Sequence, residues 1–261
     1  MRTFLTAASL TVAALVLACP PGAAAAGQDP KEARGPEVGP SARQILQEMS
    51  EYLATANEMT FQADVSYDEL TGGQMLQFGG VAKLALRRPD RMRARLDGDT
   101  RQLEMVFDGR TFTVHDAARN VYAQGEHSGT VDSALDTLFE RYGFSVPLAD
   151  LLYSDPYQTL MASVGTGNVV GRRVLDGVAC HHLAFSQETI DWQIWIEAGA
   201  RPVPRQLVIT YKDEPGAPQY IARLSGWDFH PRLSKSFFGF NPPAGADAIE
   251  FRPVAEQEVT R

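Results

Sequence analysis

Residues 59–67, MTFQADVSY, alternate between apolar and polar side chains. Phe61, Ala63 and Val65 fall at every second position, which is the period of a β-strand with one buried face. Just before this stretch, apolar residues recur instead at three- and four-residue spacing, as in an amphipathic helix with Ser41 as its N-cap. The members of that helical stripe are Ile45, Leu46, Met49, Leu53 and Ala56. The sequence therefore predicts a helix followed at once by a half-buried strand.

Alternating segments continue along the chain, separated by turn sequences such as Arg88-Pro89-Asp90. Links this short join antiparallel neighbours. The predicted strands are 81–88, 91–97, 103–107, 112–115 and 121–124, then a segment beginning at Asn168, and 180–187, 190–197, 206–212 and 220–229. Between Thr130 and Val164 the apolar spacing becomes helical instead. We therefore expect one sheet with a helical insertion.

The amino terminus has the layout of an export signal. Arg2 precedes an uncharged apolar run, residues 4–18, and small residues follow up to Ala26. At 15 residues, the run is shorter than the about 20 that cross a bilayer. Cleavage after Ala26 competes with a lipobox ending at Cys19, whose thiol would carry lipid, and Pro20 directly after Cys19 favours the first. We expect a periplasmic protein.

The domain boundaries follow from this layout and from composition. Residues 1–26 are predicted to be the signal peptide. Residues 27–40, rich in Pro, Gly and charge, are predicted to be a flexible leader. We expect 41–261 to form a single domain, because no linker-like composition separates the two groups of strands.

The composition limits the classes of partner. A formal net charge of −8 without a long basic run excludes nucleic acid. The same sign repels anionic lipid headgroups, so we expect any traffic with lipid to pass through an apolar cavity. Cys180 is the one cysteine that remains once the signal is removed. We interpret it as a small core residue without a disulfide partner.

The sequence predicts no catalytic residue, metal ligand or cofactor. Cys180 and His182 share a strand face, but no third residue orients the histidine, and His181 points the other way. The sequence has no His-Glu-x-x-His, Gly-x-Ser-x-Gly, paired-cysteine or glycine-rich phosphate motif. We expect a protein that is not an enzyme. An envelope hydrolase, the third alternative, would require a polar cleft with a perturbed Asp, Glu or His.

Three segments together resemble the LolA/LolB lipoprotein-carrier superfamily. They are GVAKLALRRPD at 80–90, FDGRTF at 107–112 and FGFNPPAG at 238–245. The segments 191–196 and 211–216 look closer still to an uncharacterised branch of predicted periplasmic proteins. The resemblance implies an α+β fold: a strongly curved antiparallel sheet, or incomplete β-barrel, with an N-terminal helix and a helical insertion that form a lid over the concave face. An acyl chain would lie between sheet and lid.

The resemblance also implies a role for Arg88. In the family, the arginine of the Arg-Pro pair points into the cavity and holds the lid shut through hydrogen bonds to backbone carbonyls. Strand parity leads to the same face independently, because Arg88 is in phase with Leu84 and Leu86. The alternative is an exposed arginine beside a turn proline. Leu53 resembles the lid leucine of the family, and core packing explains it equally well.

Trp192 and Ile194 complete the predicted ligand-binding residues, which are Arg88, Leu53, Leu84, Leu86, Trp192 and Ile194. The run 190–197 alternates, with Trp192 and Ile194 on one face and Trp195 on the other. We therefore place Trp192 in the cavity and Trp195 outside, where it could cover a helix or meet a partner protein. An ordinary core tryptophan would show the same alternation.

These observations predict an exported carrier or sensor that binds a hydrophobic ligand, the acyl chain of a lipid or lipoprotein, between half-barrel and lid. The alternative is an interaction module of the same fold, similar to RseB-type periplasmic regulators, which acts through its surface on an envelope protein. A continuous apolar cavity under the helices would favour the carrier. A filled core would favour the interaction module.

Overall fold

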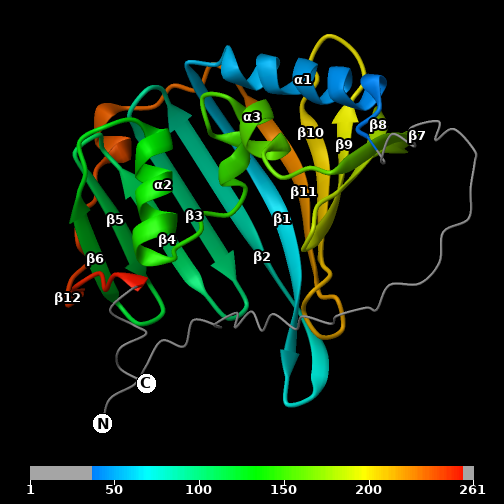
Figure 1. Ribbon diagram of the computed structural model, residues 1–261. Coiled ribbons are helices and arrows are strands. Elements are labelled where there is room, and N and C mark those ends of the chain that lie inside the picture. The colour runs from blue at the N-terminus through cyan, green and yellow to red at the C-terminus, as the bar shows by residue number, and fades with distance from the viewer. Residues whose placement is uncertain (1–36, 255–261) are drawn as a thin grey trace, which may run out of the picture. The chain divides into compact units, whose positions relative to one another are not determined.

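The computed structural model describes residues 37–254, and the predicted signal peptide lies outside them. The elements in chain order are α1 (Pro40–Ala54), β1 (Glu58–Thr71), β2 (Gln74–Arg87), β3 (Arg91–Gly98), β4 (Gln102–Phe107), β5 (Thr111–Asp116), β6 (Val121–Glu126), α2 (Val131–Tyr142), η1 (Ala149–Leu151), α3 (Pro156–Met161), β7 (Thr166–Leu175), β8 (Val178–Ser186), β9 (Ile190–Glu197), β10 (Pro204–Tyr211), β11 (Gln219–Asp228), η2 (Lys235–Phe238) and β12 (Asp247–Ile249). Figure 1 shows the helices α1, α2 and α3 over one face of the sheet.

One sheet contains all twelve described strands, in the order β12-β6-β5-β4-β3-β2-β1-β11-β10-β9-β8-β7. It consists of two antiparallel meanders, β1–β6 and β7–β11. Pairing of β1 with β11 joins them, from Thr60 opposite Asp228 to Tyr67 opposite Tyr220. The short strand β12 adds to β6 in parallel. The predicted single sheet with a helical insertion is therefore confirmed, because α2, η1 and α3 lie between the two meanders in the chain.

The sheet is less curved than the resemblance implied. The fold is α+β as predicted, but the twelve-stranded sheet is neither strongly curled nor closed, and its edge strands β12 and β7 are not paired with each other. Strong curvature accompanies closure of a sheet on itself through hydrogen bonds between edge strands. Here the helices close the apolar face instead, as a second layer packed on the sheet (Figure 1).

The first helix begins at Pro40, and the prediction of Ser41 as its N-cap is wrong. The N-cap is Gly39, and no side chain forms a capping hydrogen bond there. Proline suits the first helical position, because the backbone N–H there has no partner within the helix. The N–H of Gly39 donates to the carbonyl of Gly167 at 2.7 Å, and Val38 is buried. The chain is thus attached to β7 from Val38 onward, inside the range predicted as leader.

A continuous hydrophobic core fills the space between the helices and the sheet. The predicted stripe of α1 contributes Leu46, Met49 and Leu53, all fully buried. Alternate residues of the strands belong to the same hydrophobic core as this stripe. We call the face of the sheet that carries them the core face. Its largest fully buried side chains include Met59, Leu86, Met92, Phe107, Phe112 and Leu183. The period of two in the sequence therefore decides which face of each strand is buried.

The carboxyl-terminal segment crosses the opposite face of the sheet, which we call the outer face. Arg93 donates to the carbonyl of Phe237 at 2.6 Å, and Arg87 donates to that of Leu233 at 2.5 Å. Phe238 is buried, with the guanidinium of Arg87 5.2 Å from its ring centroid. Phe240 packs on the rings of His115 and Tyr122. Residues 233–240 therefore brace the outer face, and we call them the brace.

We expect Leu86→Ala to lower the free energy of unfolding by about 2–5 kcal/mol, because Leu86 is fully buried in the core. Lys83 is exposed on the other face of the same strand, so Lys83→Ala should stay within about 0.5 kcal/mol of the wild type. Urea unfolding followed by tryptophan fluorescence measures both variants. Equal losses would contradict the assignment of the two faces of β2.

Candidate functional site

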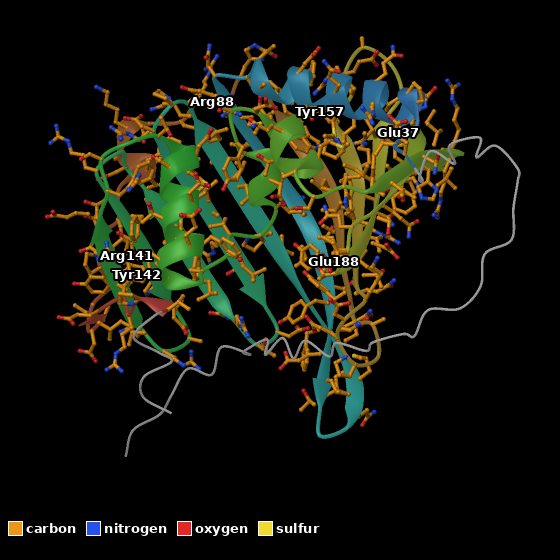
Figure 2. All side chains as sticks on the ribbon, in the orientation of Figure 1. Glu37, Arg88, Arg141, Tyr142, Tyr157 and Glu188 are labelled. Carbon is orange, nitrogen blue, oxygen red and sulfur yellow. The ribbon has the colours of Figure 1, made fainter. Side chains whose placement is uncertain are left out.

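Arg88 follows the last residue of β2 and reaches into the helical insertion (Figure 2). Its Nη1 donates to the carbonyl of Leu152 at 3.1 Å and its Nη2 to that of Tyr153 at 2.8 Å. Burial lowers the pKa of Arg88, and the nearby Asp132 carboxylate opposes that shift. The guanidinium still carries its charge at neutral pH. The side chain of Arg88 therefore turns toward the helical insertion, the direction that strand parity predicts, although β2 ends one residue earlier.

Two aspartates of α2 hold the same stretch of chain. Each carboxylate oxygen of Asp132 accepts the backbone N–H of Ser154 at 3.1 Å, and one also accepts the Ser154 hydroxyl. The hydroxyl of Tyr153 donates to Asp136 at 2.8 Å. Burial and this hydrogen bond raise the pKa of Tyr153, so the hydroxyl keeps its proton at neutral pH. We call Arg88, Asp132, Asp136, Tyr153 and Ser154 the latch. From here on, the lid is η1 with α3, residues 149–161, a shorter segment than the lid that the resemblance implies.

Sequence reasoning missed the two aspartates of the latch. Asp132 and Asp136 stand four residues apart on α2, so they share one face of the helix. That spacing is also typical of an ordinary solvated helix face, and it contains no signal for a partner in a later loop. The start of α2 has a more distinct sequence signal than these aspartates do. Thr130 is the N-cap, and its side chain accepts the N–H of Ser133.

The apolar residues predicted beside Arg88 come together in the main core. Leu53, Leu84, Leu86, Trp192 and Ile194 are each 3% exposed or less. Trp192 stacks on Phe185 with ring centroids 4.2 Å apart, and its indole N–H is buried without a hydrogen-bond partner. These side chains fill the space that the resemblance assigns to an acyl chain.

Two pockets of the described chain open on the outer face. One, of about 230 Å³, is lined by residues of the β7–β8 hairpin, β10 and β11. The other, of about 90 Å³, is lined by residues of β4 to β6 and the brace. Neither includes a residue of the three α-helices or of the predicted ligand-binding set. Buried side chains of α1 and α2 belong to the same hydrophobic cluster as those of the strands, so these two helices pack against the sheet.

Trp195 is buried, and the prediction that it lies outside is wrong. It does belong to the outer face, but it is only 5% exposed. It stacks on His182 with centroids 4.0 Å apart and packs with Cys180 and Val208. Partly buried residues of the β7–β8 hairpin, among them Leu175, pack against this group. Strand alternation indicates the face of a side chain and contains no signal for the segment that covers it.

Cys180 is buried, as the sequence predicts. Burial raises the pKa of its thiol, so the nucleophilic thiolate is disfavoured. The Nε2 of His182 lies 2.9 Å from the side-chain oxygen of Gln193, and its ring stacks on Trp195. The histidine is therefore engaged away from Cys180, in contrast to a nucleophile–base pair.

Within residues 37–254, no group of three or more His, Cys, Asp or Glu residues is arranged to hold a metal ion. No helix in this part of the chain has both the length and the apolar character needed to span a membrane.

Residues 42–252 match the sequence model of the family DUF2092, which is described as predicted periplasmic proteins. The chain belongs to this family. The match confirms the resemblance to a branch of predicted periplasmic proteins, and with it the predicted periplasmic location. No functionally curated protein matches the sequence.

Solved structures that match this chain have little sequence in common with it. An uncharacterized conserved protein from Thermus thermophilus has a TM-score of 0.47 at 14% identity, covering 80% of this chain and 99% of its own. The lipoprotein LppX of Mycobacterium tuberculosis has a TM-score of 0.46 at 12% identity, covering 75% and 99%. A LolA superfamily protein from Nitrosomonas europaea has a TM-score of 0.37 at 9% identity, covering 76% and 97%.

We expect Asp132→Asn to loosen the lid, because the neutral amide accepts the hydrogen bonds of Ser154 more weakly than the carboxylate does. Backbone amides of residues 149–161 should exchange with deuterium faster by about tenfold, since hydrogen bonds to charged groups contribute about 1.5–3 kcal/mol. Glu140→Gln, on an exposed position of the same helix, is the matched control. Equal exchange in the two variants would show that Asp132 does not secure the lid.

Proposed function

We propose that this protein is a periplasmic carrier that accepts the acyl chain of a lipid or lipoprotein between the core face and the lid, and carries out no chemistry on it. The observation that supports the proposal is the attachment of the lid to the charged side chain of Arg88 by two hydrogen bonds. In this proposal the structure is the closed state, and the predicted ligand-binding residues become accessible when the lid moves.

The physical argument concerns how a lid can be closed. Burying a guanidinium among apolar side chains has a desolvation cost, and a well-packed apolar residue would often hold a lid at least as firmly. A hydrogen-bonded charge has a different property, because water can replace its partners when the lid moves. The net cost of breaking each such bond is then about 1.5–3 kcal/mol. Arg88 therefore suits a lid that opens.

The shape of the core face supports an apolar occupant. Ala63 and Ala82 face each other across β1 and β2, and Ala222 of β11 stands opposite Val65. All four are buried. In the proposed open state, these small side chains leave depth for an alkyl chain. The affinity would come from apolar area removed from water, at about 25 cal/mol per Å².

The filled core favours a second candidate, an interaction module that acts through its surface on one envelope protein. This candidate has no need of a moving lid or a hydrophobic ligand. Crosslinking in envelope extracts followed by pull-down separates the two functions. A regulator captures one membrane protein in stoichiometric amount, whereas a carrier captures diverse lipidated clients.

Lipid extraction and mass spectrometry of the protein purified from its native envelope test the carrier directly, together with titration of a fluorescent fatty acid. We expect co-purified lipid and saturable fatty-acid binding. Absence of both would reject the carrier and leave the interaction module.

We expect Arg88→Leu to fold and to exchange a bound fluorescent fatty acid at least about tenfold faster than the wild type, because two charge-assisted hydrogen bonds to the lid are lost. Arg91→Leu, in the same turn but paired with Asp90, is the matched control. Stopped-flow fluorescence gives both rates, and thermal unfolding confirms the fold. Unchanged rates in a normally folded Arg88→Leu protein would remove Arg88 from the mechanism.

A further inference from the structure

Three arginines from three strands line the pocket of about 230 Å³ on the outer face: Arg173 of β7, Arg205 of β10 and Arg223 of β11. The chain as a whole has a formal net charge of −8. A cluster of guanidinium groups around one hollow is therefore a local reversal of the charge that the whole sequence predicts.

A β-bulge places one of the arginines. The register of β10 against β9 shifts between Pro204 and Gln206, which leaves Arg205 as the extra residue. In a regular strand, Arg205 and Gln206 would point to opposite faces of the sheet. Both line the pocket, and Gln206 pairs directly with Arg223 of the next strand. Bulges commonly re-aim side chains beside functional sites.

The β7–β8 hairpin forms one wall of the pocket and is firmly held. Asp176 and Gly177 make its two-residue turn, with φ angles of 49° and 81°. Leu175 and Val178, on either side of that turn, pack against the buried group around Trp195. The pocket therefore has a packed support, in contrast to a hollow between two mobile loops.

Acidic partners neutralise only part of this charge. Arg205 pairs with Glu197, with Nε 3.4 Å from Oε2. Asp176 is the one carboxylate in the lining. In the described part of the chain, the side chains of Arg173 and Arg223 make no hydrogen bond or ion pair, although Asp64 stands opposite Arg223 in the register. Two exposed arginines of the pocket lining thus have guanidinium donors that no partner of the described chain occupies.

We infer that this pocket binds a phosphate group. A carboxylate has two oxygens and one charge, and the two donors of a single arginine can satisfy both oxygens. A phosphate group offers more acceptor oxygens and up to about two charges, so it can accept donors from several sides at once. Arginines that reach one hollow from β7, β10 and β11 fit that chemistry. Free phosphate and a phosphorylated lipid headgroup present the same group.

The phosphate site is separate from the proposed acyl site. Leu207 and Leu224, the strand neighbours of Gln206 and Arg223, belong to the core on the other side of the sheet. Binding of phosphate therefore does not require the lid to open. A headgroup ligand would give the protein a contact with anionic lipid that its overall charge does not favour.

Titration calorimetry with inorganic phosphate, against sodium chloride of equal ionic strength, tests the site. We expect saturable binding to the wild type, weakened at least about tenfold by Arg173→Gln and by Arg223→Gln, since each removes charge-assisted hydrogen bonds. Arg172→Gln is the matched control, because Arg172 is exposed on the same strand and does not line the pocket. Thermal unfolding should be unchanged in all three variants, since the three side chains are exposed.

Sedimentation with phosphatidylcholine vesicles, with and without phosphatidic acid, identifies the source of the phosphate. Arginine-dependent binding to phosphatidic acid vesicles supports a lipid headgroup, and arginine-dependent binding to inorganic phosphate alone supports the free ion. Absence of wild-type binding to either probe overturns the site. An equal loss in Arg172→Gln overturns it too, because net charge alone would then explain the binding.

Discussion

Pairing between β1 and β11 is the interaction on which the rest of the structure depends. It joins a strand near the start of the described chain to one near its end, and so makes one sheet of two meanders. Without it, each meander would have an additional unpaired edge and only part of an apolar face for the helices. With it, Arg88 of the first meander and Trp192 of the second lie beneath the same helical layer.

Other segments of the chain cover parts of both faces of this sheet. For this reason, strand alternation alone does not predict which side chains are exposed. The carboxyl-terminal brace covers the outer face of the first meander through Arg87, Arg93 and Phe238. In the second meander, residues of the β7–β8 hairpin cover part of Trp195. An apolar residue on the outer face is therefore exposed or buried according to which segment crosses it.

The sequence alone predicts what depends on local period and parity. Alternation in 59–67 identifies β1, and the phase of Arg88 with Leu84 and Leu86 predicts that its side chain turns inward. Features that depend on contacts distant in the chain were missed. The three exposed residues of β12 have no strand pattern, Asp132 meets Ser154 only after the insertion has folded, and the openness of the sheet depends on how its edges end.

The core face is not built for maximal stability, and this bears on what it does. Three of its polar atoms are buried without a hydrogen-bond partner: Arg88 Nε, Trp192 Nε1 and the hydroxyl of Tyr220. An unpaired buried donor costs about 1–3 kcal/mol relative to a hydrated one. In the proposed open state, water that entered as the lid opened would recover part of that cost and so lower the free energy of opening. Trp195 Nε1 and His115 Nε2 are buried and unpaired too, on the outer face. The proposed opening is therefore favoured by where the three atoms lie, beneath the helices, and not by unpaired atoms in general.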